Sequence, residues 1–160
     1  MIKRIGSQKG MLLASSLSVV SLFSAQLSAS EAKHYPGVFI GALNSGGETE
    51  LSLGLEYEYR FTPHWGAGLV YEKASEAHHG DGVSATIAAL YYHPYAGWRL
   101  GAGIGREKVH GDHGHTEDLY RLNVAYDFHL GDFGVAPTFS VDRVDGHHSR
   151  VYGISITKAF

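Results

Sequence analysis

The 160-residue sequence has no cysteine, only 4 prolines and few charged residues. The lack of cysteine excludes a disulfide scaffold, a zinc ribbon and a thiol nucleophile. Charged residues make up 18% of the chain, below the usual fraction of about a quarter, and the net charge of −3 gives no indication of nucleic-acid binding. Glycine and tyrosine are abundant instead, with 21 and 10 residues. Neither disorder nor a charged helical bundle is expected, and the length suits one domain.

The first 32 residues have the order of a secretory signal. A basic start without acids precedes the uncharged stretch 11–23, and a segment of small and polar residues follows. The apolar stretch is too short for a transmembrane helix, which needs about 20 residues. We therefore expect residues 1–32 to be a signal peptide and residues 33–160 to form the exported domain. An amphipathic N-terminal anchor is the alternative.

Beyond the signal, apolar residues recur at every second position. In 51–61, Leu, Tyr and Phe occupy the odd positions, while Ser, Gly, Glu and Arg occupy the even ones. A period of two is typical of a strand with one apolar face. The pattern recurs in 65–71, 83–91, 98–104, 120–128, 135–141 and 152–156, with a less regular stretch at 37–44. No window of helical length has an amphipathic period of 3.6, so the sequence predicts eight strands.

The links between these strands alternate in length. Short turns with Pro, Gly or Asp are expected at 62–64, 93–97 and 130–133. Longer polar links are expected at 73–82, 106–118 and 144–150, and an intermediate one at 44–49. Short turns then gather at one end of a meander and longer links at the other, as in outer-membrane barrels.

A membrane barrel and a soluble lipocalin-type barrel differ in whether the apolar face of the strands points outward or inward. The opposite face consists mainly of Gly, Ser and Thr, which suits a narrow barrel interior better than a water-facing surface. The apolar face is therefore expected to contact lipid. The predicted fold class is all-β, an eight-stranded antiparallel up-and-down transmembrane β-barrel.

Two sets of residues follow from this assignment. Long charged side chains on the inner face are expected to pair in a network that closes the lumen: Glu56, Glu58, Arg60, Glu72, Arg99, Arg121, Asp127 and Asp142. A polar path through the lumen is the alternative. Aromatic residues on the outer face are expected to form girdles at the membrane interfaces: Tyr59, Trp65, Tyr71, Tyr91, Trp98, Tyr120, Phe128 and Tyr152.

Two segments carry a family resemblance. Residues 56–68, EYEYRFTPHWGAG, resemble the strand–turn–strand of small OmpA/OmpX-type outer-membrane barrels. The alternating apolar residues that end in Phe160 resemble the C-terminal assembly signal of this class, although Lys158 stands where an aromatic residue is usual. The resemblance covers residues 34–160. It implies export to the outer membrane of a Gram-negative bacterium, contact with outer-membrane lipid, and recognition of the C-terminal strand by the barrel-assembly machinery. We expect a monomer with no nucleic-acid partner.

Histidines concentrate in the expected longer links. Together with acidic neighbours they suggest a weak Zn, Ni or Cu site at one rim, formed by His78, His79, His110, Asp112, His113, His115, His147 and His148. A solvated, metal-free set of links is the competing interpretation. A third is a rim that gains positive charge below about pH 6.5.

Evidence for an enzyme is weak. His147 and Ser149 have the His-x-Ser spacing of outer-membrane lipid A deacylases, but no acid follows Ser149. No phosphate-binding loop, dinucleotide fingerprint or Gly-x-Ser-x-Gly motif is present, and no cofactor is expected apart from a metal at the rim. The favoured hypothesis is a non-enzymatic envelope protein with a structural or surface-recognition role. Metal binding is the alternative, and a lipid A-modifying hydrolase comes third.

Overall fold

The computed structural model describes residues 33–75, 82–95, 97–111 and 114–160. The predicted signal peptide, residues 1–32, lies outside this range. The strands are β1 (Lys33–Ser45), β2 (Glu48–Arg60), β3 (Trp65–Ala74), β4 (Val83–Tyr92), β5 (Trp98–Val109), β6 (Thr116–Tyr126), β7 (Phe128–Leu130), β8 (Phe133–Val144) and β9 (His147–Lys158). The described part of the chain contains no helix that could cross a bilayer.

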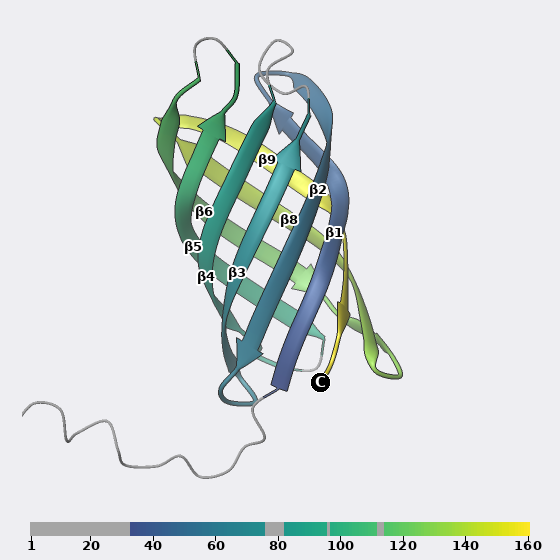
Figure 1. Ribbon diagram of the computed structural model, residues 1–160. Helices are drawn as coiled ribbons and strands as arrows, with labels where there is room; N and C mark the ends of the chain where they lie inside the picture. Colours follow the sequence, from purple (N-terminus) through teal and green to yellow (C-terminus); the bar gives the residue numbers. More distant parts are fainter. Residues whose placement is uncertain (1–32, 76–81, 96, 112–113) are drawn as a thin grey trace, which may run out of the picture.

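The strands form one closed antiparallel sheet (Figure 1). Consecutive strands pair with one another, except β6 with β7, and β1 pairs with β9 to close the barrel. The short β7 continues β6, since both pair with β8. The nine segments are therefore eight barrel strands, and the predicted up-and-down barrel is confirmed.

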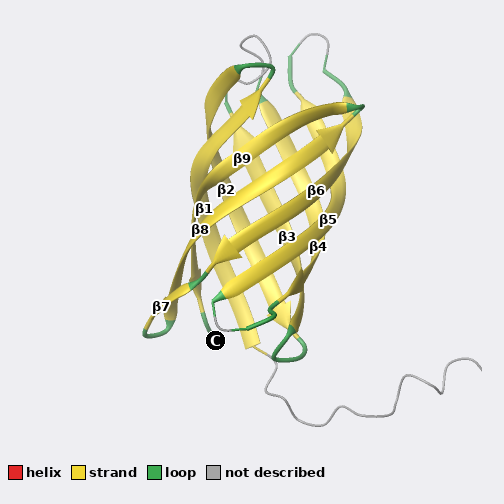
Figure 2. Ribbon diagram, turned by 180° about the vertical axis from the view of Figure 1, so that it is seen from behind, coloured by secondary structure: helices red, strands yellow, loops and turns green. Residues whose placement is uncertain are grey.

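The break between β6 and β7 has a local cause. The pairs Ala125–Thr138 and Phe128–Val135 keep one register across the break. In that register Pro137 stands opposite Tyr126, and proline has no N–H to donate to a ladder. On the other side of the strand, the amide of Asp127 donates to the carbonyl of Gly97 at 2.6 Å, so the register with β5 continues past the break. Beyond the break, the β7–β8 hairpin extends from the barrel (Figure 2).

The two ends of the barrel differ. At the short-turn end lie the connections β2–β3, β4–β5 and β7–β8; the opposite, long-loop end holds β3–β4 and β5–β6. Two further connections at the long-loop end are tight, Gly46-Gly47 and Asp145-Gly146. Both residues of each turn have positive φ, at 60° and 92° and at 43° and 79°, as in primed hairpin turns that match the twist of the strands. The expected long link at 144–150 is therefore wrong, because Asp-Gly is a hairpin signal, and His147 and His148 belong to β9.

The inside–outside assignment is inverted in one strand, β4. Its apolar parity faces the lumen, with Val83, Ala85, Ile87, Ala89 and Tyr91. Thr86, Ala88, Leu90 and Tyr92 face outward and are exposed. Because both faces of β4 carry apolar residues, its own pattern does not fix the register. The neighbours decide it, since Ala85 pairs with the inward Glu72 and Tyr91 pairs with Gly101.

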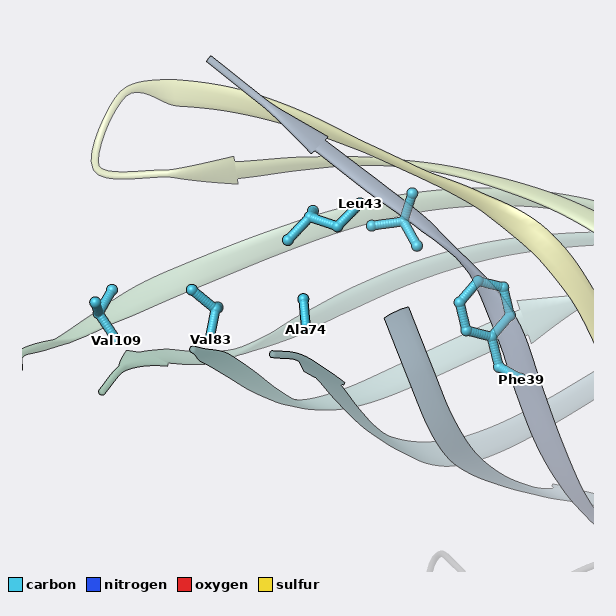
Figure 3. Packing of buried hydrophobic residues seen from close by; sticks show 6 residues of the cluster. Phe39, Leu43, Ala74, Val83 and Val109 are labelled. Atoms are coloured by element: carbon cyan, nitrogen blue, oxygen red, sulfur yellow. The ribbon is translucent and has the colours of Figure 1, made fainter. Parts of the chain in front are cut away.

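The inverted strand contributes to an apolar filling of the lumen towards the long-loop end. One cluster of buried side chains comprises Phe39, Leu43, Ala74, Val83, Val109 and Val151. Figure 3 shows these side chains, five of them labelled, on the inner side of the wall. A second cluster comprises Val70, Ala85, Ile87, Leu119 and Val144. The sequence pattern predicted a lumen filled by small and charged residues and did not predict these two apolar clusters.

The seam between β1 and β9 is packed against a glycine pair. Gly41 pairs with Gly153, and the ring of Phe39 covers both, since added Cβ atoms would lie 2.4 and 2.8 Å from ring carbons. A Cβ at Gly153 would also lie 2.3 Å from the carbonyl oxygen of Ile40. An aromatic ring above cross-strand glycines supplies the side-chain packing that the glycines lack.

Gly153→Val is therefore expected to lower the free energy of unfolding by about 1–3 kcal/mol, because the wall would have to shift. The measurement is urea unfolding in phosphocholine vesicles, followed by tryptophan fluorescence. Ala88→Val is the matched control, since Ala88 is exposed on the outer face. Equal stability of the two variants would contradict the close packing at the seam.

Candidate functional site

A buried ion triad spans the lumen near its middle. Arg121 of β6 binds Asp142 of β8 through Nε and Nη2, each at 2.6 Å. It binds Glu72 of β3 through Nη1 at 2.6 Å and Nη2 at 2.8 Å. The strand next to β6 leaves room for the guanidinium, because Gly103 stands opposite Arg121. One arginine thus holds two carboxylates in bidentate geometry, the strongest form of this interaction.

A second charged cluster fills the short-turn end. Glu58 accepts from Arg60 Nε at 3.1 Å, and its Oε1 lies 2.6 Å from His93 Nε2. Arg60 also lies 3.8 Å from Asp127 and 4.1 Å from the centre of the Tyr35 ring. Charged groups and an aromatic face therefore close this end together.

Arg99 links the second cluster to the centre of the lumen. Its Nη1 lies 3.7 Å from Glu56 and 3.8 Å from Glu58, and its guanidinium lies 5.4 Å from the Tyr91 ring centre. Ser155 donates to Glu56 at 3.0 Å. All eight charged residues expected in the lumen thus point inward, in two groups. The sequence interpretation missed His93 and Tyr91 as members, although both share the inward parity of β4.

Between the two groups lies a cavity of about 20 Å³, lined by residues that include Glu56, Arg99, Arg121 and Asn123. This volume suits about one water molecule. Three buried polar atoms in this region have no hydrogen-bond partner among the described residues, namely Glu56 Oε1, Glu58 Oε2 and Arg99 Nε. The middle of the lumen is therefore packed with side chains and has no space for a larger ligand.

The aromatic residues favour one rim. Outward Trp65, Trp98 and Phe128 lie at the short-turn end, where the rings of Trp65 and Tyr92 are tilted with centroids 4.8 Å apart, and those of Trp98 and Tyr126 meet edge to face at 5.3 Å. Tyr59 lies at this end as well, 5.2 Å from the ring of His34. Outward aromatic residues further towards the long-loop end are Tyr71, Tyr120 and Tyr152. The girdle assignment of Tyr91 is wrong, because its ring is buried inside the barrel.

The structure does not gather those expected metal ligands that lie within the described ranges. His78, His79, Asp112 and His113 lie outside the described residues. His110 Nε2 lies 3.0 Å from Ser84 Oγ, and His115 lies 3.3 Å from Glu117. His147 and His148 lie on β9, on opposite faces. No three His, Asp or Glu side chains in the described ranges could hold an ion together, and metal binding at the rim stays a prediction.

The His-x-Ser pair does not face the lipid. Ser149 is buried on the inner face, opposite Asp142 in the register of β8 and β9. The carboxylate of Asp142 is engaged by Arg121. His147 is part of a strand and shares the inward parity of Ser149, which differs from the loop position expected.

Phe160 lies at the short-turn end beside the first strand. Its amide donates to the carbonyl of His34 at 2.9 Å, and the His34 amide donates back at 3.2 Å. Its side chain is exposed on the outside of the barrel. The ammonium of Lys158 lies 4.7 Å from the Phe160 ring centre and 5.7 Å from that of Phe133. The ammonium group of Lys158 thus contacts two aromatic rings, although Lys158 itself replaces the aromatic residue that is usual at this position.

Comparison with solved structures gives the same fold. Neisserial surface protein A aligns with a TM-score of 0.62 at 11% identity, over 81% of this chain and 97% of its own. The N-terminal β-barrel domain of Pseudomonas aeruginosa OprF aligns at 0.54 and 10%, over 81% and 100%. Ail of Yersinia pestis aligns at 0.53 and 13%, over 81% and 97%. No protein-family model and no curated protein matches the sequence. The chain therefore has the fold of small outer-membrane barrels, as the resemblance predicted.

The triad yields a stability prediction. Arg121→Met leaves two buried carboxylates without a partner and is expected to cost about 3–5 kcal/mol of unfolding free energy. Arg106→Met is the control, because Arg106 is 77% exposed and lies 3.9 Å from Asp118, a pair worth about 1 kcal/mol at most. Urea unfolding in phosphocholine vesicles compares the variants.

A second variant separates charge from packing. Arg121→Met combined with Glu72→Gln and Asp142→Asn removes the uncompensated charges and is expected to recover much of the lost stability. If Arg121→Met unfolds at the same urea concentration as Arg106→Met, the triad does not stabilise the barrel.

Proposed function

We propose that the protein is an integral barrel of the outer membrane of a Gram-negative bacterium, exported with residues 1–32 as its signal. Its role is structural or one of surface recognition, and it is not an enzyme. The observation that carries the proposal is the distribution of side chains: the outer wall is apolar and the lumen is packed. Ligand chemistry is then left to the ends of the barrel and its outer face.

The outer wall supports insertion into lipid. The side chains of Leu51, Ile104 and Leu122 are 61%, 65% and 68% exposed. Most of the other outward positions in the middle of the strands are also apolar. Such a continuous apolar surface is not found on soluble monomers. A closed barrel also satisfies its backbone hydrogen bonds without water, which a bilayer requires.

The difference between the two ends supports an orientation. Outer-membrane barrels keep short turns on the periplasmic side and longer loops outside the cell. We therefore assign the short-turn end to the periplasm, together with the aromatic rim and Phe160. In this orientation Phe160 is available to the barrel-assembly machinery during insertion, and the barrel acts as a monomer.

Folding should depend on an amphiphile. The chain without residues 1–32 is expected to gain sheet structure only in detergent or vesicles, and to migrate differently in SDS gels with and without boiling. Circular dichroism and gel mobility measure the two effects. A protein that stays folded and dispersed in plain buffer would contradict membrane insertion.

The lumen should not conduct. Ile87 and Leu119 are 0% and 1% exposed inside the barrel, and the charged residues there are engaged with one another. Reconstitution into planar bilayers is expected to give no steady channels, with protein-free bilayers as the reference. A stable ohmic conductance would contradict a closed lumen and would favour a polar path.

A further inference from the structure

Basic side chains gather on the outer face at the long-loop end. We call this set the cationic belt: Lys73, Arg106, Lys108, Arg143 and Arg150, all exposed. Their strand pairings place them on the face that carries the lipid-facing residues. Among the described strand residues on this part of the outer face, Asp118 is the only acid. The belt therefore presents a strongly positive surface just above the apolar wall.

Acids at the same end point the other way. Glu50 pairs with the buried Leu43, and Glu107 pairs with Ala85 and Glu117, all on the inner face. A surface built only for solubility mixes both signs. The separation of acids inside and bases outside indicates that the outer face meets an anionic environment which the mouth of the lumen does not meet.

The belt forms two local groups. Lys73 and Lys108 flank Ser84 from the neighbouring strands, and Arg106 lies two residues from Lys108 on the same face. With strands about 4.8 Å apart, the two lysine backbones are separated by about 10 Å across Ser84. The second group is Arg143 and Arg150, which are diagonal neighbours on β8 and β9, and Arg143 pairs with Tyr120 and His148 on either side.

Shallow apolar grooves lead down the wall from both groups. One groove is lined by Thr86, Ala88, Ile104 and Tyr120 and reaches Arg106 and Asp118. The other also includes Ala88, Ile104 and Tyr120 and reaches Arg143 and His148. Small side chains lie between larger ones there, so that each groove has an apolar floor and a basic side chain at its upper end. An apolar surface below a basic side chain is complementary to an acyl chain below a phosphate group.

The short-turn end has no such belt. Lys158 is the only outward Lys or Arg at that end among the described strand residues whose side chains the structure places, and its ammonium lies over Phe133 and Phe160. Aromatic rings dominate that rim instead. The two rims therefore suit two different leaflets.

We infer that the cationic belt binds the phosphate groups of a phosphorylated, multiply acylated glycolipid of the lipid A class, with its acyl chains in the two grooves. The inference rests on the proposed function, which places the long-loop end in the outer leaflet. A phosphomonoester carries more than one negative charge and three acceptor oxygens, and it therefore suits two or three neighbouring cations. The Arg106–Asp118 pair at 3.9 Å, with both side chains more than three-quarters exposed, leaves Arg106 accessible.

The test uses the protein refolded in phosphocholine nanodiscs that contain lipid A. Native mass spectrometry or calorimetry measures binding. The two comparison lipids are dephosphorylated lipid A and phosphatidylglycerol. Lys73→Gln combined with Arg106→Gln and Lys108→Gln is expected to weaken lipid A binding by about 100-fold, since each cation contributes about fivefold near an anionic surface. Arg143→Gln should weaken it by a smaller factor, and Lys158→Gln, at the other rim, should leave it unchanged.

Each result has a fixed meaning. Tight binding of lipid A that needs both its phosphates and the belt supports the inference. Equal binding of the dephosphorylated lipid, equal binding of phosphatidylglycerol, or equal binding by the triple variant overturns it. A protein that folds in the nanodiscs but ignores lipid A leaves the membrane proposal intact, whereas failure to fold in any amphiphile contradicts the proposed function itself.

Discussion

The closure of a single antiparallel sheet is the constraint on which the other features of this structure depend. Inside a bilayer no water can satisfy an open strand edge, so the pairing of β1 with β9 is required for the wall to be stable there. Closure with eight strands fixes a narrow interior. The interior must then be filled by side chains, and the glycines that face Arg121, Tyr91 and Phe39 supply the space for them.

The filling of the lumen divides into parts with different chemistry. Charged groups lie at the short-turn end and in the middle, while apolar side chains lie beside the inward acids Glu50, Glu107 and Glu117 towards the long-loop end. Removing a charge from water is costly, and the bidentate contacts of Arg121 offset part of that cost. The apolar part needs no such partners and excludes water from the wall. Together the parts leave the ends and the outer face as the places where this barrel meets other molecules.

The sequence predicted the architecture well because apolar and polar residues alternate clearly along any strand whose lipid-facing and lumen-facing sides differ in polarity. Strands such as β2, with Leu on one face and Glu or Ser on the other, show their orientation directly. β4 does not, because both of its faces are apolar, and only its neighbours fix its phase. The position of His93 follows from that phase and was missed with it. The tight turn at Asp145-Gly146 was overlooked because its polar surroundings suggested a long link. Which side chains meet across the lumen depends on the stagger of distant strands, which no local pattern contains.

The order of the strands also bears on how the barrel forms. Every pairing except one joins strands that are consecutive around the meander, so hairpins can assemble from contacts that are close in the chain. The pairing of residues 37–45 with residues 149–157 is the exception, and it spans nearly the whole domain. Long-range contacts of this kind are slow to form. The Phe39 ring over Gly41 and Gly153 therefore packs at the one contact that joins the first strand to the last, and closure of the barrel depends on the space that these two glycines leave.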